Sequence, residues 1–226
     1  MTTNTKATRE LSKAKTSIEV ELELRERILR QEYAPGAPLV EERLAFELGT
    51  SRNIVRTALM ALESKRLVQR IPNRGAIVAK LDGEQLFAIY DVLELLEGLS
   101  ARLAAARSNP EDWDELIALF GEPLEAAIDK GDYERFFDAV MQYRRTVSEY
   151  AANSYLDEVL SGIHDQVHSI IRRILIIPGR AHESLLEHRR ILQALRAGEE
   201  EEAERLKRDN MRAARKALEN YRDFLI

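Results

Sequence analysis

Apolar residues recur every three to four positions along most of this chain, which is the spacing of one face of an α-helix. The first apolar series starts near Ser17 and must stop before the Pro35-Gly36 pair. A second, shorter series covers residues 40–48 and stops at a glycine, a residue suited to the left-handed end of a helix. A third series begins after a Thr50-Ser51 cap. The pattern therefore predicts three helices in the N-terminal part of the chain.

The residues after the third helix follow a different pattern. Two short β-branched segments, LVQRI and AIVAK, flank the turn sequence Pro-Asn-Arg-Gly, which predicts a hairpin. Three helices and a hairpin within residues 17–81 indicate a winged helix-turn-helix domain. Residues 1–16 are polar and basic without apolar periodicity, so we expect a disordered arm there.

Beyond residue 81 the strand pattern disappears, and long helical series follow one another. The expected helices span 83–107, 111–130, 132–152, 155–177, 180–197 and 199–224. Gly121 and Pro123 should interrupt or kink the second of them. We therefore predict that residues 82–226 form an all-α antiparallel bundle of six to seven helices, and that the fold class is mostly α.

The charge of the chain is unevenly distributed. A net charge of -5 argues at first against a nucleic-acid partner, yet residues 1–80 carry 15 Lys and Arg against 10 Asp and Glu. Residues 81–226 carry 19 against 29, so the N-terminal part is basic and the remainder acidic. The basic part is the one that the helix pattern assigns to DNA binding.

Composition narrows the possible chemistry and location. The chain contains no cysteine, so any metal would need His, Asp or Glu as ligands. No apolar run reaches the length of a membrane span, and the N-terminus lacks the apolar stretch of a secretory signal. We expect a cytoplasmic protein without a membrane partner.

The third predicted helix has the chemistry of a DNA-reading helix. Its apolar residues share one face, which leaves Arg52, Asn53 and Arg56 on the exposed side. Arginine and asparagine donate to base edges in the major groove. Ser51 can hold a phosphate together with the helix N-terminus, and Arg74 at the hairpin tip can enter an adjacent minor groove. The alternative, a merely solvated pair of arginines, is weaker because helix, turn, helix and basic wing occur together.

The first domain resembles GntR-family bacterial transcription regulators. The PG turn, the LA..LG..R..VR.AL..LE framework and the NRGA.V wing stand in order over about residues 20–81. The DNA contacts implied by this resemblance are Arg52 and Arg56 in the major groove and at phosphates, Arg43 at a flanking phosphate, and Asn73, Arg74 and Gly75 at the wing tip. Ile54 and Thr57 replace the usual proline and glutamate, which should alter rigidity or operator preference without abolishing binding.

The second domain resembles the FCD effector domain of the FadR subfamily. The resemblance covers about residues 83–222 and is carried by DVLELLEGLSARLAA and ESLLEHRRILQALRAGEEEEAERLKRDN. Many such domains hold a divalent metal through an aspartate, a histidine four residues later and two further histidines. Aligned on Asn153 and the EHRRIL segment, the four places fall on Val140, Arg144, His188 and Asn210. Only His188 is a competent ligand, so we predict that the metal site is lost and that no cofactor is needed.

The lost metal site leaves a pocket that can serve differently. Arg144 at an inward position beside His188 and Asn210 could bind the carboxylate or phosphate of an effector, with Val140 and Tyr143 completing the site. Alternatively, Arg144 is exposed or paired with a structural acid.

Three other features of this domain leave further interpretations open. A shifted alignment on Asp138 and Gln142 keeps an acid but gains no second histidine. Leu93 stands where many relatives have arginine, which would make one side of the pocket less polar. His164 and His168 have a zinc-chelating spacing, although the sequence fixes no further ligand near them.

We therefore expect a homodimeric, DNA-binding transcription regulator, a repressor of a palindromic operator, controlled by a small-molecule effector such as an organic acid. The alternatives are a metal-dependent FCD-type regulator, a constitutive DNA binder with a vestigial pocket and, more remotely, a helical-bundle metalloenzyme. The chain has no HExxH, phosphate-binding glycine loop or nucleophile motif, and we predict that it is not an enzyme.

Overall fold

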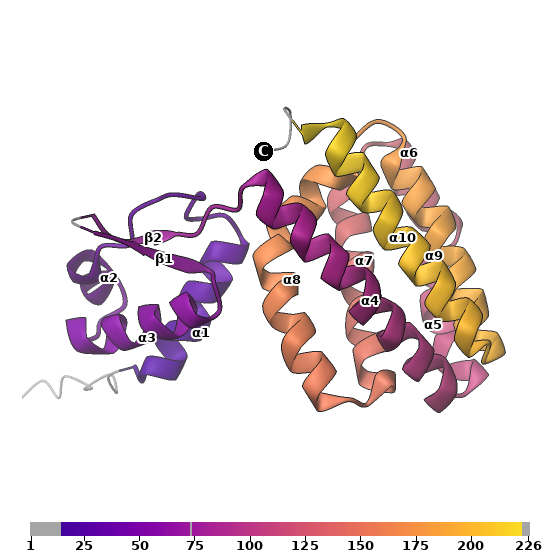
Figure 1. The fold of residues 1–226 in the computed structure, drawn as a ribbon, viewed down its shortest axis with the longest axis horizontal. Coiled ribbons are helices and arrows are strands. Elements are labelled where there is room, and N and C mark those ends of the chain that lie inside the picture. The colour runs from indigo at the N-terminus through magenta and orange to yellow at the C-terminus, as the bar shows by residue number, and fades with distance from the viewer. Residues whose placement is uncertain (1–14, 73, 223–226) are drawn as a thin grey trace, which may run out of the picture. The chain divides into compact units, whose positions relative to one another are not determined.

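The computed structural model describes residues 15–72 and 74–222, and the chain divides into two compact units after Lys80 (Figure 1). The predicted arm falls on residues 1–14, which lie outside the described residues, and on Lys15 and Thr16. Thr16 caps the first helix in a reciprocal capping box with Glu19, so ordered structure begins slightly earlier than the sequence pattern suggests.

The N-terminal unit is a winged helix-turn-helix, as predicted. Its elements are α1 (Ser17–Leu29), α2 (Glu41–Glu47), α3 (Arg52–Ser64), β1 (Val68–Ile71) and β2 (Gly75–Val78). The apolar faces of the helices enclose a core in which Val20, Leu24, Leu44, Val55 and Leu59 are fully buried. This core fixes the orientation of α3 and hence of its outward side chains.

Two local details differ from or extend the prediction. Val40 was expected on the apolar face of the second helix, but it is the N-cap residue of α2 and is 50% exposed. The two strands pair antiparallel from Val68 opposite Val78 to Ile71 opposite Gly75, which confirms the hairpin. Gly75 has a φ of +78°, a conformation that favours glycine at the end of the turn.

The C-terminal unit is all-helical. Its elements are α4 (Gly83–Arg107), the 3-10 turn η1 (Pro110–Trp113), α5 (Asp114–Leu119), α6 (Glu122–Asp129), α7 (Tyr133–Ala151), α8 (Ser154–Leu175), α9 (Arg180–Ala197) and α10 (Glu200–Asn220). The interruption expected at Gly121 and Pro123 is confirmed, because Gly121 caps α6 and Pro123 occupies its first turn. None of the described helices is both long and apolar enough to span a membrane.

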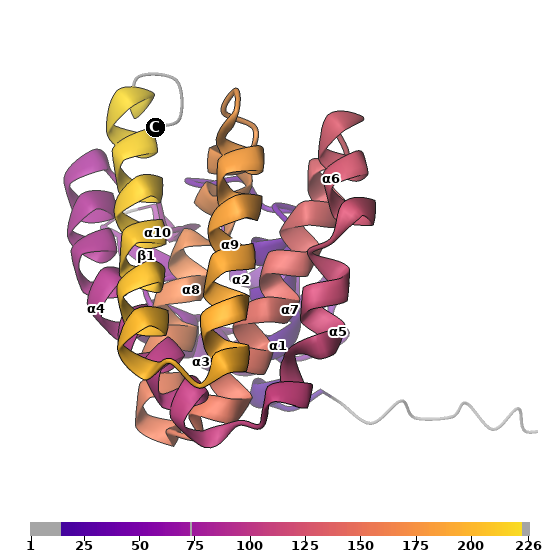
Figure 2. The ribbon, with the colours of Figure 1, turned by 90° about the vertical axis from the view of Figure 1, so that its right-hand side faces the viewer.

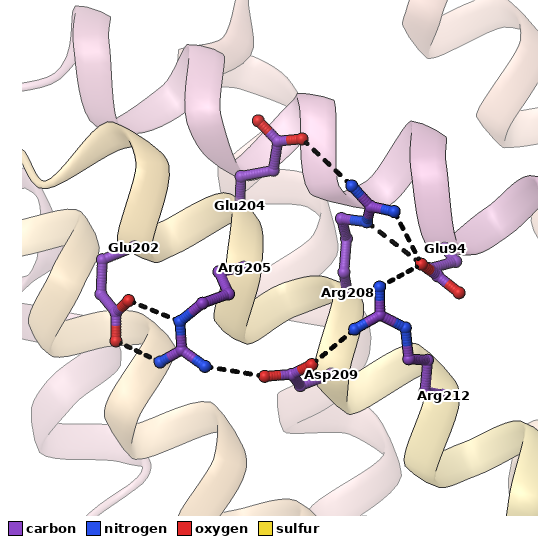
Figure 3. Close-up of polar contacts among 7 residues, drawn as sticks. All are labelled: Glu94, Glu202, Glu204, Arg205, Arg208, Asp209 and Arg212. Carbon is purple, nitrogen blue, oxygen red and sulfur yellow. Dashed lines mark hydrogen bonds and ion pairs between the residues drawn. The ribbon is translucent and has the colours of Figure 1, made fainter.

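α10 packs between α4 and α9 (Figure 2). α4 and α10 approach closely at Gly98, where an added Cβ would lie 2.6 Å from Cγ of Arg208. Arg208 and Arg212 of α10 both bond the carboxylate of Glu94 on α4, and Asp209 binds Arg212 in turn (Figure 3). These contacts fix the rotation of α10 and turn its opposite face toward the interior.

The core of this unit is rich in aromatic side chains. Trp113, Phe120, Phe136 and Tyr143 are fully buried, and the indole N–H of Trp113 donates to Oγ of Ser108 at 2.8 Å. The lone tryptophan is thus part of the core.

Candidate DNA-reading surface and effector cavity

α3 presents its polar residues on one exposed side. Arg52, Asn53 and Arg56 are exposed, whereas Val55 and Leu59 on the opposite face are fully buried. The three side chains therefore lie on the side of α3 that is open to a DNA groove, while the apolar face holds the helix in place.

Arg56 is held by a carboxylate from the neighbouring helix. Its Nε lies 3.1 Å from both oxygens of Glu41, and its Nη2 donates to Oε2 at 2.8 Å. This pairing lowers the pKa of Glu41 and raises that of Arg56, so both groups are ionised at neutral pH. Glu41 thus restricts the directions in which Arg56 can point.

The remaining predicted contacts of the helices lie around α2 and the start of α3. Oγ of Ser51 accepts the N–H of Ile54 at 3.3 Å as the N-cap of α3, which confirms the capping role. Arg43 lies on the exposed side of α2 with its Nε 3.1 Å from Glu47. The hydroxyl of Thr57, at the position where glutamate is common, donates to the carbonyl of Asn53 within α3.

The wing residues are only partly visible. Asn73 lies outside the described residues, whereas Arg74 and Gly75 are exposed at the end of the hairpin. Arg74 is positioned by its backbone N–H, which donates to the carbonyl of Ile71 at 3.0 Å. Arg74 therefore lies in the turn between the two strands, at the hairpin tip that the sequence predicts.

The helical unit contains a narrow, charged cavity of about 40 Å³ lined by α4, α7, α8, α9 and α10. Four residues that the sequence predicted for the effector site, Val140, Arg144, His188 and Asn210, line it. Tyr143 does not line the cavity but lies behind His188, with ring centroids 4.9 Å apart. The sequence alignment therefore identified four positions, far apart in the chain, that line the same cavity.

One buried carboxylate contacts side chains from three helices, two cations and a histidine. Oε2 of Glu97 on α4 lies 3.2 Å from Nζ of Lys207, and its Oε1 lies 3.5 Å from Nε of Arg144 and 2.7 Å from Nε2 of His164. Burial alone would raise the pKa of Glu97, but Lys207, Arg144 and His164 together hold it well below its usual range. Glu97 is therefore ionised, and it compensates part of the positive charge around the cavity.

A second carboxylate is held on the other side of the cavity. Both oxygens of Glu187 accept from the guanidinium of Arg180, at 3.0 and 2.8 Å, and Oε2 also accepts from Nδ2 of Asn210 at 2.5 Å. The amide oxygen of Asn210 accepts from Nζ of Lys207 at 3.2 Å. Lys207 and Asn210 thus connect the two carboxylate clusters.

His188 is buried in a neutral form. Its Nδ1 lies 2.7 Å from the carbonyl oxygen of Ser184, which places the ring proton on Nδ1. Burial and the nearby Lys207 lower the pKa of His188 to about 3. The ring also stacks on Phe120 at 5.3 Å, so Nε2 of His188 remains as a lone-pair acceptor held in a fixed orientation.

The side chains around the cavity do not fit a divalent cation. The places of the family's aspartate and first histidine hold Val140 and Arg144, and Lys207 adds a second positive charge beside His188. Within residues 15–72 and 74–222, no group of three or more His, Asp or Glu side chains is arranged to hold a metal. A metal here would face cations in place of the anionic ligands it requires.

The other candidate ligands lie elsewhere. Asp138 and Gln142 are exposed, so the shifted alignment does not lead into the cavity. His164 binds Glu97, whereas the ring of His168 stands edge-on to Phe137 at 5.0 Å. The i, i+4 histidine pair therefore has two separate sets of neighbours.

Sequence reasoning missed three charged residues of the cavity region: Glu97, Arg180 and Lys207. Glu97 lies on the otherwise apolar face of α4, one turn after Leu93, and a charged residue in such a series is a signal that could have been used. Lys207 lies three positions before Asn210, on the same face of α10. Arg180 directly follows a Pro-Gly break, and no periodic pattern marks it as buried.

Comparison with known families divides the chain in the same way as the fold. Residues 16–78 match the family described as bacterial regulatory proteins, gntR family, and residues 88–213 match the FCD domain. The FCD match alone covers more than half of the chain.

Proteins similar to this chain include repressors of bacterial operons. The gluconate operon transcriptional repressor of Bacillus subtilis (strain 168) is 30% identical over 185 residues, covering 80% of this chain and 73% of that protein. The galactonate operon transcriptional repressor of Escherichia coli (strain K12) is 27% identical over 202 residues, covering 80% and 87%. The solved structure of E. coli McbR/YncC matches with a TM-score of 0.74 at 24% identity, covering 92% of this chain and 100% of that one, and so supports the fold.

Proposed function

Because the chain belongs to the GntR family of bacterial transcription regulators and carries an FCD domain, we propose that it is a DNA-binding repressor controlled by an organic acid. The acid binds in the charged cavity of the helical unit and changes the affinity of the protein for its operator. The observation that carries this proposal is Arg144, a nearly buried arginine that lines the cavity and leaves Nε and Nη1 without a hydrogen bond among the described residues. No metal takes part in this proposal.

Repression requires that α3 reads a specific sequence. Arg52, Asn53 and Arg56 would contact base edges and nearby phosphates, while Arg43 and Ser51 would position the unit on the DNA backbone. The similar repressors of the gluconate and galactonate operons support repression, and not activation, as the mode of regulation. We propose that the protein acts in the cytoplasm, where a bacterial operator lies.

A homodimer would read the two halves of a palindromic operator. α4 offers a surface for such an assembly, because Val92, Leu95 and Leu99 are spaced along one side of it and are 46%, 54% and 39% exposed. A two-fold axis beside α4 would cover this apolar stripe with its own copy.

The effector is proposed to be an anion because the cavity region carries excess positive charge. The guanidinium of Arg144 can donate charge-assisted hydrogen bonds to a carboxylate, which gives both affinity and orientation. Gluconate and galactonate, for which two relatives' operons are named, are themselves carboxylates, and this agrees with an acid as effector. We propose no enzymatic activity.

A second candidate function is constitutive DNA binding with a vestigial cavity. It is favoured by the volume of about 40 Å³, which suits one or two water molecules better than a metabolite. An acid would have to widen the cavity by moving its apolar wall.

Gel shift of the full chain on the intergenic DNA upstream of its own gene, with and without a panel of organic acids, tests the proposal. An acid-dependent change in affinity is expected for the wild type and should be lost in Arg144→Ala. The matched control is Arg145→Ala, because Arg145 is the next residue on α7 and is exposed. A wild-type complex that ignores every acid would support the constitutive alternative, and equal responses of wild type and Arg144→Ala would remove Arg144 from the site.

A further inference from the structure

The polar atoms around the cavity that lack hydrogen bonds are of two kinds, donors and an acceptor. In the described part of the chain, Nε and Nη1 of Arg144 and Nε of Arg180 lack hydrogen-bond partners, and all three can only donate. Nε2 of His188 also lacks a partner, but it can only accept, because the ring proton lies on Nδ1 toward Ser184. A ligand that matches both sets must accept from guanidinium groups and donate to an imidazole nitrogen.

The charges set the number of anionic groups that the cavity can accept. Arg144, Arg180 and Lys207 carry three positive charges beside the cavity, and Glu97 and Glu187 carry two negative charges. A third carboxylate, Glu183, lies 3.8 Å from Arg180, but its side chain is 70% exposed, so solvent screens its charge. Burial lowers the pKa of Lys207, and the carboxylates of Glu97 and Glu187 oppose this shift. His188 is neutral, because burial lowers its pKa to about 3. One carboxylate would balance the cluster, whereas two would leave an uncompensated negative charge in a buried site.

We propose that the cavity binds a hydroxy-monocarboxylate directly, without a metal, with the carboxylate facing Arg144 and Lys207 and a hydroxyl group donating to Nε2 of His188. This inference rests on the proposed function, and it names the chemical class of the effector. In this proposal His188 does not bind a metal. Its Nε2 lone pair accepts a hydrogen bond from the hydroxyl group of the acid. Lys207 supplies the positive charge that a metal would otherwise bring.

The apolar wall explains how such a ligand would act on the fold. The apolar part of the cavity lining includes Val140, Ile171, Ile174 and Met211, from α7, α8 and α10. The cavity holds no more than a few water molecules, so a six-carbon acid must displace some of these side chains, and methionine adapts most readily. Binding therefore changes the packing between these helices, which is the kind of differential contact that a population shift requires.

Calorimetric titration of the EDTA-treated full chain with matched acids tests this inference. D-gluconate and hexanoate have six carbons each and differ in hydroxyl groups, as do lactate and propionate with three carbons. D-glucarate adds a second carboxylate to the gluconate frame. We expect at least one hydroxy acid to bind about tenfold more tightly than its deoxy partner, the effect of one hydrogen bond, and D-glucarate to bind more weakly than D-gluconate.

Two variants separate the two parts of the site. His188→Phe keeps a ring against Phe120 but removes the acceptor, so it should bind hydroxy and deoxy acids equally. Lys207→Met should weaken both kinds of acid by about tenfold or more, because a charged partner is lost. If His188→Phe does not fold, nitrogen NMR of the histidine-labelled wild type replaces it. Nε2 of His188 should then appear unprotonated and shift when the hydroxy acid is added, but not with the deoxy acid.

The outcomes distinguish a failure of this inference from a failure of the proposed function. If the acids bind but neither hydroxy acid is preferred, or if D-glucarate binds most tightly, the inference is wrong and an acid-controlled regulator remains. If binding appears only after a divalent metal is added back, the direct contact is wrong. If none of the five acids binds, both the inference and its basis are overturned.

Discussion

Arg56 of α3 and Glu41 of α2 form a two-point ion pair on the surface that we propose to face DNA, with Nε and Nη2 of the arginine 2.8–3.1 Å from the carboxylate oxygens. The pair orients a side chain that would otherwise sample many rotamers. It also brings a negative charge close to the phosphates of an approaching duplex. Glu41 should therefore favour specificity at the expense of general affinity.

Replacement of Glu41 by glutamine tests this balance. In Glu41→Gln we expect non-specific DNA affinity to rise, because a repulsive charge is removed, and the ratio of operator to non-specific affinity to fall, because Arg56 loses its orientation. Fluorescence anisotropy on operator and scrambled duplexes at one salt concentration measures both. Glu63→Gln, which removes the partner of Arg70, is the matched control. An unchanged ratio would mean that Glu41 does not orient Arg56 on DNA.

Arg52 and Arg43 should have different kinds of effect on DNA binding. Arg52→Ala removes an expected base contact, so operator affinity should fall by about tenfold or more while non-specific affinity changes little. Arg43→Ala removes an expected phosphate contact, so it should weaken binding to all sequences and reduce the slope of log K against log salt by about one. Salt titrations on both duplexes distinguish these outcomes. Identical behaviour of the two variants would contradict the assignment.

His188 should make the helical unit less stable in acid. The pKa of His188 is about 3 in the folded state, below the ordinary value of about 6.5, so the unfolded state binds more protons between these pH values. The stabilisation is therefore fully present above pH 6.5 and is lost progressively as the pH falls toward 3. Between pH 6.5 and 5 this group should cost roughly 2 kcal/mol of unfolding free energy.

Urea unfolding followed by the fluorescence of buried Trp113 gives this measurement. His188→Phe should flatten the pH dependence in that window, whereas His182→Phe, a change at an exposed histidine, should leave it as in the wild type. Glu97 adds a similar loss, but at lower pH, because its folded pKa lies well below the usual carboxyl range. If wild type and His188→Phe have the same slope, His188 is not buried as a neutral ring.

A charge in the apolar stripe of α4 should dissociate the proposed dimer. Leu95→Glu would place an unpaired carboxylate at the centre of the stripe, and desolvating it costs more than the apolar contact gains. Sedimentation velocity should show monomers for this variant at concentrations where the wild type is dimeric. Leu186→Glu on α9, where the leucine is 52% exposed, controls for a general effect of surface charge. A dimeric Leu95→Glu protein would place the interface elsewhere.

Most of the fold could be predicted from the sequence because its signals are local. Apolar periodicity and the caps at Ser51, Gly121 and Gly198 fix where helices begin and end, and the Pro-Asn-Arg-Gly turn fixes the hairpin. The sequence assigns Val40 wrongly to the helix face, because it stands four positions before Leu44 and so fits the apolar series. In the structure it is the N-cap residue of α2, one position before the helix begins.

The site was less predictable because its parts come from distant segments. Alignment with a family found Arg144, His188 and Asn210, since the family's ligands mark those positions. Arg180 and Glu97 interact with groups that the family pattern does not mention, and their burial depends on how α4 and α9 pack against α10. Only the three-dimensional arrangement shows that the positive charges exceed the negative ones there.

The carboxylate of Glu97 contacts cations of α7 and α10 and a histidine of α8, so four helices depend on a single residue of α4. In evolutionary terms these positions cannot change independently. Relatives that keep an aspartate and a histidine at the places of Val140 and Arg144 should lack a lysine at the place of Lys207, since a metal and an ammonium group would compete for the same space. If a lysine replaces a metal in this chain, substitutions at these sites should be linked among its relatives.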